Sequence, residues 1–393
     1  MKRRIVLALS LLVVLALALT ACGNKATPTP KPQPTQAPAQ PTKAAPPTQA
    51  PKPTNTPAPT QAPQVKPAKE IVFYNWSEYI DPKVYELFEK ETGIKVVEDN
   101  FSSNEELMAK LQGGATGYAL IVPSDYTVKA LIDQNMLAPL DKDKIPNLKN
   151  LAPKFQNLYY DPGNKYCVPY QWGTTGIGYR ADKVDKPDSW AVFFNPDPNS
   201  PAYGRMTMLD DAREAFAAAL IYLGYDANTT DEKQLEEAKQ ALIRAKAALS
   251  GYDSDTYEDL LASGENLMAH GWNGDFLQAQ EENENIAYTI PKEGGVIWVD
   301  NVCIPATVTP EQKLAAEMFL DFILRPDIGA MISEYNYYAT PNKAAEAKLP
   351  KDFLEDPTVY PPQEVIAKLQ FIKPVGKAES LYERMWDEVK AAP

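Results

Sequence analysis

The chain has 393 residues with three cysteines and one histidine, and its 52 acidic residues outnumber its 39 basic ones, for a net charge of −13. Residues 1–69 hold nine of the basic residues and none of the acidic ones, so 30 basic and 52 acidic residues leave the rest at −22. Such a charge attracts cations and argues against nucleic acid and anionic lipid surfaces as partners. One histidine cannot form a histidine-based metal site. We expect no metal, no cofactor and a monomer.

The first residues have the order of a secretory signal: three basic residues, an apolar run over 5–19, and small residues. The run is shorter than the roughly 20 residues that a transmembrane helix needs. Leu19-Thr20-Ala21-Cys22 resembles the lipobox of bacterial lipoproteins. We therefore predict a lipoprotein signal peptide over 1–21 and lipidation of Cys22, which would anchor the protein outside the cytoplasm, in the periplasm or at the cell surface.

Residues 22–69 follow as a segment dominated by Pro, Thr, Gln, Ala and Lys, with no aromatic residue. Such a composition cannot bury enough apolar surface to form a core, and it is typical of a polyproline II-like spacer. We predict a disordered linker with no binding or catalytic role.

About 324 residues remain, which favours two domains. The first of them alternate between extended and helical patterns, which is typical of a mostly parallel sheet covered by helices. The expected strands are 71–75, 94–99 and 119–123, and the expected helices are 81–92, 104–112 and 126–134. Because such sheets bind ligands beyond the carboxyl ends of their strands, polar and aromatic residues that follow these strands are candidates for a site.

The middle of the chain predicts a second set of elements. Helices are expected over 211–223 and 231–248, the latter with Thr230 as its N-cap. Strands are expected over 205–209, 266–271 and 286–290, and two further helices over 310–323 and 327–334. The simplest arrangement is a first domain interrupted by a second, with crossings near 173–179 and 298–302. Ligand clefts favour such junctions.

Residues 295–305 form an apolar strand with Trp298 and Asp300 two positions apart, so both side chains leave one face of the strand. A ring beside a carboxylate suits an organic cation, because the carboxylate adds Coulomb attraction to the attraction of the ring face, which is about 0.5 to 2 kcal/mol. Taken alone, the pattern also fits a strand with a half-buried tryptophan and a solvated aspartate.

From about residue 70 onward the chain resembles the bacterial spermidine/putrescine-binding proteins, the solute receptors of polyamine ABC transporters. Nine motifs carry the resemblance, in order: YNWSEY (74–79), FEKETGIKV (88–96), VPS (122–124), PYQWGTTGIG (169–178), DDARE (210–214), GWNGD (271–275), PKEGG (291–295), LRPD (324–327) and YATPN (338–342). The resemblance implies an α/β, two-lobed periplasmic-binding-protein fold (type II-like), in which each lobe is a sheet flanked by helices and two crossover strands act as a hinge. We assign 70–174 with 299–345 to lobe 1 and 175–298 with 346–393 to lobe 2.

The resemblance also implies which residues bind the ligand. Aromatic walls would cover the methylene chain of putrescine or spermidine, and acids would hold its nitrogens. Asp300 with Asp275 is expected at one end and Glu214, with Asp211, at the other. Asp275 is typical of putrescine binders and Trp298 of spermidine binders, so the two cues disagree. The full expected set is Trp76, Tyr79, Ser124, Tyr126, Asp211, Glu214, Trp272, Asp275, Trp298, Asp300 and Tyr338.

Two positions depart from the family pattern. Ala119 stands where an acid is usual, and Ile372 stands where spermidine binders carry a glutamine, with Gln370 nearby. Cys167 and Cys303 would lie on neighbouring strands if the resemblance holds, so a disulfide is possible in an oxidising compartment. We favour two buried thiols. His270 is expected to be structural or to lie behind residues that contact the ligand.

The function expected from the whole sequence is that of an extracytoplasmic receptor that delivers a polyamine to the permease subunits of an ABC transporter, and not that of an enzyme. A receptor of the same fold for another cationic small solute is the alternative. A glycosidase with paired carboxylates and a ferric-iron receptor using Tyr337 and Tyr338 are less well supported by the residues present.

Overall fold

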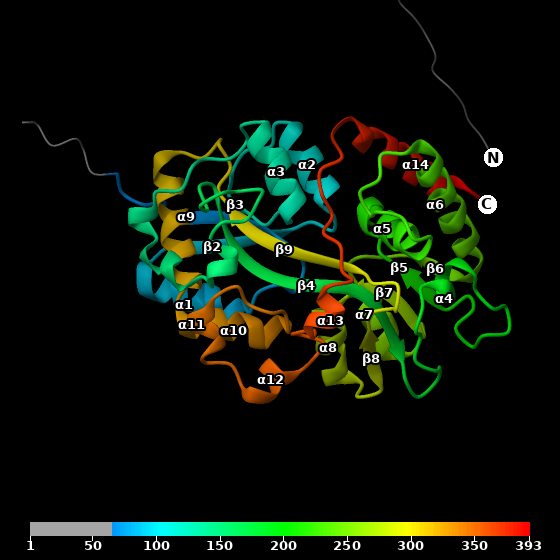
Figure 1. Cartoon of the computed structure of the whole chain (residues 1–393). Coiled ribbons are helices and arrows are strands. Elements are labelled where there is room, and N and C mark those ends of the chain that lie inside the picture. The colour runs from blue at the N-terminus through cyan, green and yellow to red at the C-terminus, as the bar shows by residue number, and fades with distance from the viewer. Residues whose placement is uncertain (1–64) are drawn as a thin grey trace, which may run out of the picture. The chain divides into compact units, whose positions relative to one another are not determined.

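The computed structural model describes residues 65–393. The predicted signal peptide, Cys22 and the predicted linker as far as residue 64 lie outside the described residues. Nine strands form one mixed sheet in the order β2-β1-β3-β9-β4-β7-β5-β6, with β8 paired to β4. Helices surround both ends of this sheet (Figure 1).

The first half of the sheet contains the predicted alternation of strands and helices. Strand β1 is parallel to both β2 and β3, and β9 is antiparallel to β3. Phe88 of the first helix packs against Phe319 of a later one, with ring centroids 5.0 Å apart, in the core beside this half. Its elements are β1 (Glu70–Asn75), α1 (Pro82–Thr92), β2 (Lys95–Asn100), α2 (Asn104–Gln112), β3 (Tyr118–Ile121), α3 (Asp125–Asp133), α9 (Pro310–Ile323), α10 (Pro326–Asn336) and α11 (Lys343–Glu346).

Two long strands join the halves: β4 (Cys167–Arg180) and β9 (Val296–Cys303). Strand β4 pairs with β9 as far as Thr175 and from there with β7. Figure 1 shows the two ribbons running side by side through the middle of the fold. The predicted crossings therefore lie on the paired central strands. The change of partner falls at Thr175, where the predicted lobe boundary lies; the boundary itself stays a prediction.

The second half of the sheet holds the elements expected from the middle of the chain, together with several short ones. The helix expected over 231–248 buries an apolar stripe of Leu235, Ala238, Leu242 and Ala245. Its N-cap is Asp231, so the prediction of Thr230 was wrong. The Asp231 carboxylate accepts hydrogen bonds from two backbone amides there. The elements are α4 (Ala191–Phe194), β5 (Met206–Met208), α5 (Ala212–Tyr222), α6 (Glu232–Ala245), β6 (Leu249–Tyr252), α7 (Tyr257–Ser263), β7 (Met268–Trp272), α8 (Asn273–Glu282) and β8 (Ile286–Thr289).

The C-terminal segment returns across the fold. It contains α12 (Lys351–Glu355), α13 (Gln363–Ile366) and α14 (Glu379–Ala391), and α14 packs on α5 and α6. Tyr382 of α14 lies 5.3 Å from the ring of Phe216 in α5. Five short 3-10 helices complete the described elements: Lys142–Lys144, Pro146–Asn150, Pro153–Phe155, Lys246–Ala248 and Gly376–Ala378.

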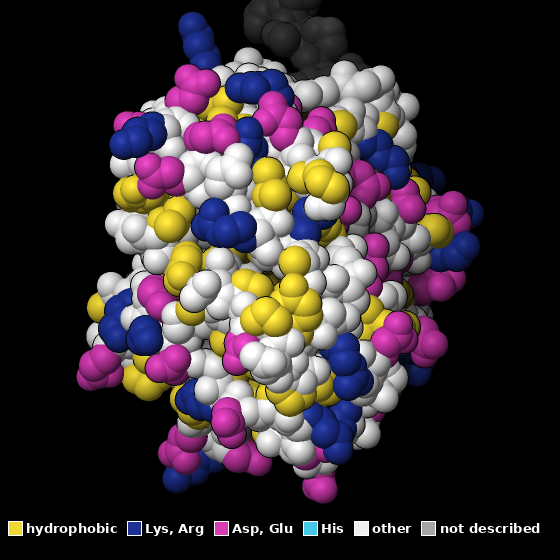
Figure 2. Space-filling model, turned by 90° about the vertical axis from the view of Figure 1, so that its right-hand side faces the viewer, with side chains coloured by type: hydrophobic (Ala, Val, Ile, Leu, Met, Phe, Trp, Pro, Cys, Tyr) yellow, Lys and Arg dark blue, Asp and Glu magenta, His cyan; other side chains and the backbone are white. Residues whose placement is uncertain are grey.

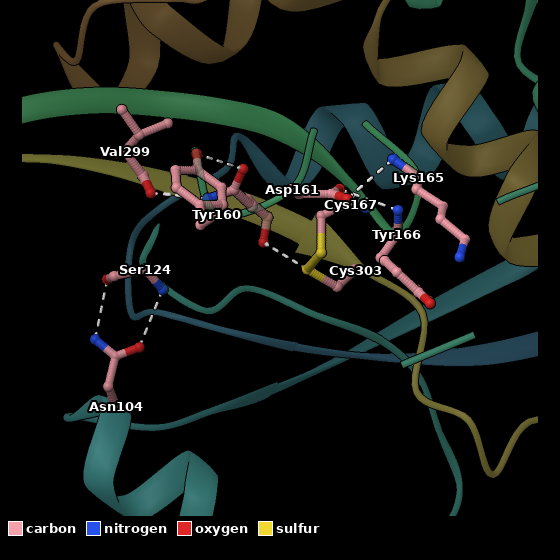
Figure 3. Close-up of a disulfide and its surroundings, with 10 residues drawn as sticks. Asn104, Ser124, Tyr160, Asp161, Lys165, Tyr166, Cys167, Val299 and Cys303 are labelled. Atoms are coloured by element: carbon pink, nitrogen blue, oxygen red, sulfur yellow. Dashed lines mark hydrogen bonds between the residues drawn. A yellow bond between two sulfur atoms is a disulfide. The ribbon is translucent and has the colours of Figure 1, made fainter. Parts of the chain in front are cut away.

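Cys167 and Cys303 form a disulfide, so the expectation of two thiols was wrong. The two cysteines are direct partners in the antiparallel register of β4 and β9, with Cα atoms 4.4 Å apart. That separation lies within the range that a disulfide spans. Figure 3 shows the bond between the two strands, with Asp161 accepting hydrogen bonds from the backbone at the start of β4. The disulfide ties the two crossing strands together at their end in the first half.

Acidic and basic side chains are interspersed on the face shown in Figure 2, so the negative charge of the folded part is not a single patch there. Within residues 65–393, the helices fall short of the length and apolarity that crossing a membrane would take.

Candidate functional site

A cavity lies where β1, β3, β7 and β9 end or cross. Its volume is about 780 Å³, counting the part open to solvent. All eleven residues predicted from the resemblance line it: Trp76, Tyr79, Ser124, Tyr126, Asp211, Glu214, Trp272, Asp275, Trp298, Asp300 and Tyr338. Residues from both halves of the sheet thus meet at one hollow.

Aromatic rings make much of its wall. Trp76 follows β1 and lies 5.6 Å, edge to face, from Trp272 at the end of β7. Tyr338 lies 5.3 Å from Tyr79 and 5.1 Å from Trp298. Ring faces in these orientations can cover an apolar chain and attract a positive charge.

The position of the Trp298 ring depends on Gly173 in the neighbouring strand, because the ring occupies the space that a side chain there would fill. A Cβ atom built at Gly173 would come within 2.6 Å of that ring and 2.5 Å of Oδ1 of Asn273. The glycines of the stretch 173–178 lie inside strand β4, where the absence of a Cβ atom allows close approach of neighbouring side chains.

Asp300 points from β9 to the same face as Trp298, as the strand spacing predicts. Its Oδ2 accepts a hydrogen bond from the Tyr79 hydroxyl (2.8 Å) and its Oδ1 from the Ser124 hydroxyl (2.7 Å). Ser124 in turn is held by Asn104 through two hydrogen bonds, visible in Figure 3. Burial raises the pKa of Asp300 to about 7, although both hydroxyl groups favour its charged form.

Asp211 and Glu214 lie at the start of α5. Asp211 is the N-cap, since its Oδ1 accepts a hydrogen bond from the amide of Glu214 at 2.9 Å. Oε1 of Glu214 accepts from the hydroxyl of Thr175 at 3.0 Å, while its Oε2 is buried and has no hydrogen-bond partner among the described residues. Burial first, and then the charge of Asp211, raise the pKa of Glu214 to about 8. Oε2 of Glu214 therefore needs a donor that residues 65–393 do not supply.

Asp275 lies in the first turn of α8, where its carboxylate accepts hydrogen bonds from the hydroxyls of Tyr257 and Tyr338. Burial raises its pKa to about 6. Tyr126 is placed differently from the other aromatic residues, because the guanidinium of Arg213 lies 5.6 Å from its ring centre. Arg213 itself pairs with Glu379.

Several residues of the cavity were not predicted. Ile372 lines it, whereas the Oε1 of Gln370 accepts a hydrogen bond from the amide of Ala227, so Gln370 does not replace the missing glutamine. Two of the unpredicted acids, Glu78 and Asp125, directly adjoin predicted site residues in the sequence, a signal that could have found them. The others lie on loops and helices whose position depends on the fold. The unpredicted lining residues are Ser77, Glu78, Phe101, Asn104, Asp125, Ser254, Asp255, Glu258 and Ile372.

The carboxylates and aromatic rings of this cavity suit a cation. The ion pairs between residues 65 and 393 do not involve Asp125, Asp211, Glu214, Asp275 or Asp300. Over the same range there is no group of three metal-ligating side chains suited to an ion. His270 is fully buried beside Trp190 and is not among the residues that line the cavity.

Comparison with known proteins shows which proteins this chain is similar to. A family model described as bacterial extracellular solute-binding protein matches residues 83–361. The spermidine/putrescine-binding periplasmic protein of Escherichia coli is 39% identical over 324 residues, which cover 82% of this chain and 91% of that protein. The putrescine-binding periplasmic protein PotF of the same organism is also 39% identical, over 82% of this chain and 92% of its own length. A solved structure titled as a putative spermidine/putrescine ABC transporter from Listeria monocytogenes has 36% identity and a TM-score of 0.78, covering 83% of this chain and all of that one.

Proposed function

Since this chain belongs to the bacterial extracellular solute-binding proteins, we propose that it captures a polyamine, putrescine or spermidine, in its cavity and delivers it to an ABC transporter. Two relatives are named as periplasmic binding proteins for these amines, and the solved structure from Listeria monocytogenes as a putative ABC transporter. A binding role in transport, without catalysis, is proposed here. In this proposal the eleven predicted residues contact the ligand.

One observation carries the proposal. The cavity holds buried carboxylates that form no ion pair with the basic residues of 65–393, and Oε2 of Glu214 has no hydrogen-bond donor within that range. Leaving such groups unpaired costs free energy, on the order of 1 to 3 kcal/mol for each and more for a charged group. A diamine or triamine supplies both positive charge and N–H donors, while its methylene chain lies against the rings of Trp76, Trp272 and Trp298.

The proposed cycle uses the two central strands. Because β4 and β9 are the strands that join the two halves, a change in their twist would open the cavity, and ligand contacts with both halves would favour the closed state. Asp300 and Ser124 would hold the ligand from the first half, and Glu214 and Asp275 from the second. The closed form would then be the one presented to the permease.

The N-terminal part of the sequence indicates where the protein would act. A signal peptide over 1–21 and a lipid on Cys22 would keep the receptor at the outer side of the membrane, and the linker over 22–69 would give it reach. Labelling with a radioactive fatty acid in a bacterial host tests the anchor. Loss of label in a Cys22→Ala variant is expected, and equal labelling would contradict it.

Isothermal titration calorimetry of the purified protein tests the ligand. Putrescine, spermidine and spermine are titrated in parallel with 1,4-butanediol, which has the length of putrescine but no charge. We expect binding of at least one amine, none of the diol, and more than a tenfold loss of amine affinity in Asp300→Asn. Asp133→Asn, which changes an exposed carboxylate of α3, serves as the control. Absence of binding by all three amines would contradict the proposal.

A further inference from the structure

Asp125 is a carboxylate of the cavity that the sequence did not single out. It is the first residue of α3, it is 1% exposed, and it lines the cavity. Its Oδ1 accepts a hydrogen bond from the amide of Tyr126 at 2.7 Å. Its Oδ2 is buried and has no hydrogen-bond partner among the described residues. A buried charged oxygen without a hydrogen-bond donor costs free energy. A ligand that brings an N–H group to Oδ2 would therefore be favoured at this position.

The backbone places Asp125 next to Asp300. Ser124 forms an isolated antiparallel bridge with Asp300, and the amide of Asn301 donates to the carbonyl of Pro123 at 3.0 Å. The two carboxylates therefore sit on adjoining segments of the same wall. Burial raises the pKa of Asp125 well above its usual range, and the charge of Asp300 raises it further. A cation bound between them would remove this repulsion.

The surroundings of the pair also permit Asp125 to be charged. It lies in the first turn of α3, where the partial positive charge of the helix N-terminus stabilises an anion by about 0.3 to 1 kcal/mol. The backbone amides of Tyr126 and, more weakly, Val299 act in the same direction. Each oxygen of Asp300 already accepts one hydroxyl hydrogen bond, and a carboxylate oxygen can accept a second.

We propose that Asp125 and Asp300 bind one terminal ammonium of the ligand between them and thereby select primary amines over methylated ones. This inference rests on the proposed function and names a determinant of specificity within it. Aromatic rings alone attract a methylated ammonium as well as a primary one. To donate a hydrogen bond to both carboxylates, the ligand nitrogen needs at least two N–H groups. A primary ammonium has enough N–H groups, whereas a tertiary ammonium does not.

The test compares two ligands in wild type and in Asp125→Asn. The first ligand is putrescine or spermidine, whichever wild type binds more tightly, and the second is its analogue with two methyl groups on each terminal nitrogen. Wild type is expected to prefer the unmethylated amine at least 100-fold. In Asp125→Asn the preference should shrink at least tenfold, because the primary amine loses affinity and the methylated one does not. The steric effect of the methyl groups cancels when the two ratios are compared.

The controls separate the outcomes. Asp133→Asn alters an exposed carboxylate of the same helix and should keep the wild-type preference. If Asp125→Asn does not fold, Asp125→Ser replaces it, since serine is also accepted near a helix start. An unchanged preference, an equal loss for both ligands, or a wild-type preference below tenfold would each overturn the inference. Failure of wild type to bind any amine would instead overturn the proposed function.

Discussion

The hydroxyl of Tyr79 donates a hydrogen bond to Oδ2 of Asp300 at 2.8 Å, although 221 positions separate the two residues in the chain. Tyr79 follows β1, and Asp300 lies in β9. With Ser124 on the other oxygen, the carboxylate is fixed from both sides and faces the cavity. The site is thus oriented by hydroxyl groups that leave the charge of Asp300 uncompensated.

Replacing Tyr79 by Phe removes one of these hydrogen bonds and keeps the ring. We expect about a tenfold loss of amine affinity, since hydrogen bonds to charged groups contribute about 1.5 to 3 kcal/mol and water can replace part of that. Calorimetric titration of both proteins with the preferred amine measures this change in affinity. Tyr159→Phe is the matched control, because Tyr159 is 51% exposed. Equal affinities of wild type and Tyr79→Phe would show that the hydroxyl does not orient Asp300.

Gly173→Ala should displace the ring of Trp298, because the added Cβ would come within 2.6 Å of it. Overpacking of this kind costs about 1 to 3 kcal/mol, and a displaced ring no longer covers the ligand. We expect both lower stability in urea and at least a tenfold loss of amine affinity. Gly251→Ala is the control, since a Cβ there meets no atom within 4 Å. A Gly173→Ala protein with normal affinity would contradict the assigned role of the ring.

Local patterns predicted the fold well where the elements are long or strictly periodic. The bounds of α2 and α9 match the expected ranges, and β1, β2 and β3 are parallel as expected. Four-residue strands and one-turn helices such as β6 and α4 carry too few positions for a period to be seen. The Thr230 cap was misjudged because the adjacent Asp231 is an equally good capping residue.

Features that depend on pairing between distant segments were harder to predict. Whether Cys167 and Cys303 form a disulfide depends on the register of β4 against β9, which no local pattern contains. The resemblance supplied eleven of the residues that line the cavity. It did not mark Asp125, whose proposed role follows from its burial and from the missing hydrogen-bond partner of its Oδ2 among the described residues. Glu258 was also not predicted, because its helix α7 was not.

Amine affinity should fall as the pH is lowered from 8 to 5.5. In the free protein the pKa of Asp300 is about 7 and that of Glu214 about 8, both raised mainly by burial. A bound cation favours the charged carboxylates, so binding lowers both pKa values and releases protons near pH 7. Primary amines, with pKa values of roughly 10, stay charged throughout this range.

Calorimetry at several pH values, in two buffers of different ionisation enthalpy, measures affinity and proton release together. We expect at least tenfold weaker binding at pH 5.5 than at pH 8. A constant affinity, or proton uptake on binding, would contradict the involvement of these carboxylates.

The Cys167–Cys303 disulfide should contribute to stability more than to binding. It joins positions 136 residues apart, and closing so long a loop restricts the unfolded chain, a stabilisation of about 2 to 5 kcal/mol. A Cys167→Ala/Cys303→Ala variant should unfold at lower urea concentration than oxidised wild type. Adding a reductant should lower the urea concentration at which wild type is half unfolded. It should not change this midpoint for the double variant. Coincident curves for all samples would show that the bond adds no stability.

His270 should make the protein sensitive to acid. It is fully buried, both ring nitrogens lack a hydrogen-bond partner among the described residues, and burial lowers its pKa to about 3. In the unfolded chain its pKa is about 6.5, so between these values the unfolded state binds the extra proton. Stability contributed through this group is therefore present above about pH 6.5 and is lost as the pH falls toward 3.

A His270→Leu variant isolates this effect, because the chain has no other histidine. Leucine has a similar size and carries no nitrogen that burial leaves unpaired, so stability at pH 7 should be equal or higher. Between pH 6.5 and 4.5 the wild type should lose about 1 to 3 kcal/mol more than the variant. Urea unfolding at pH 7, 5.5 and 4.5 gives the free energy of unfolding of both proteins. Both contain the carboxylates of the cavity, so the difference between the two proteins reports on His270. Parallel stability curves would mean that His270 stays neutral in both states over this range, contrary to its burial without a partner.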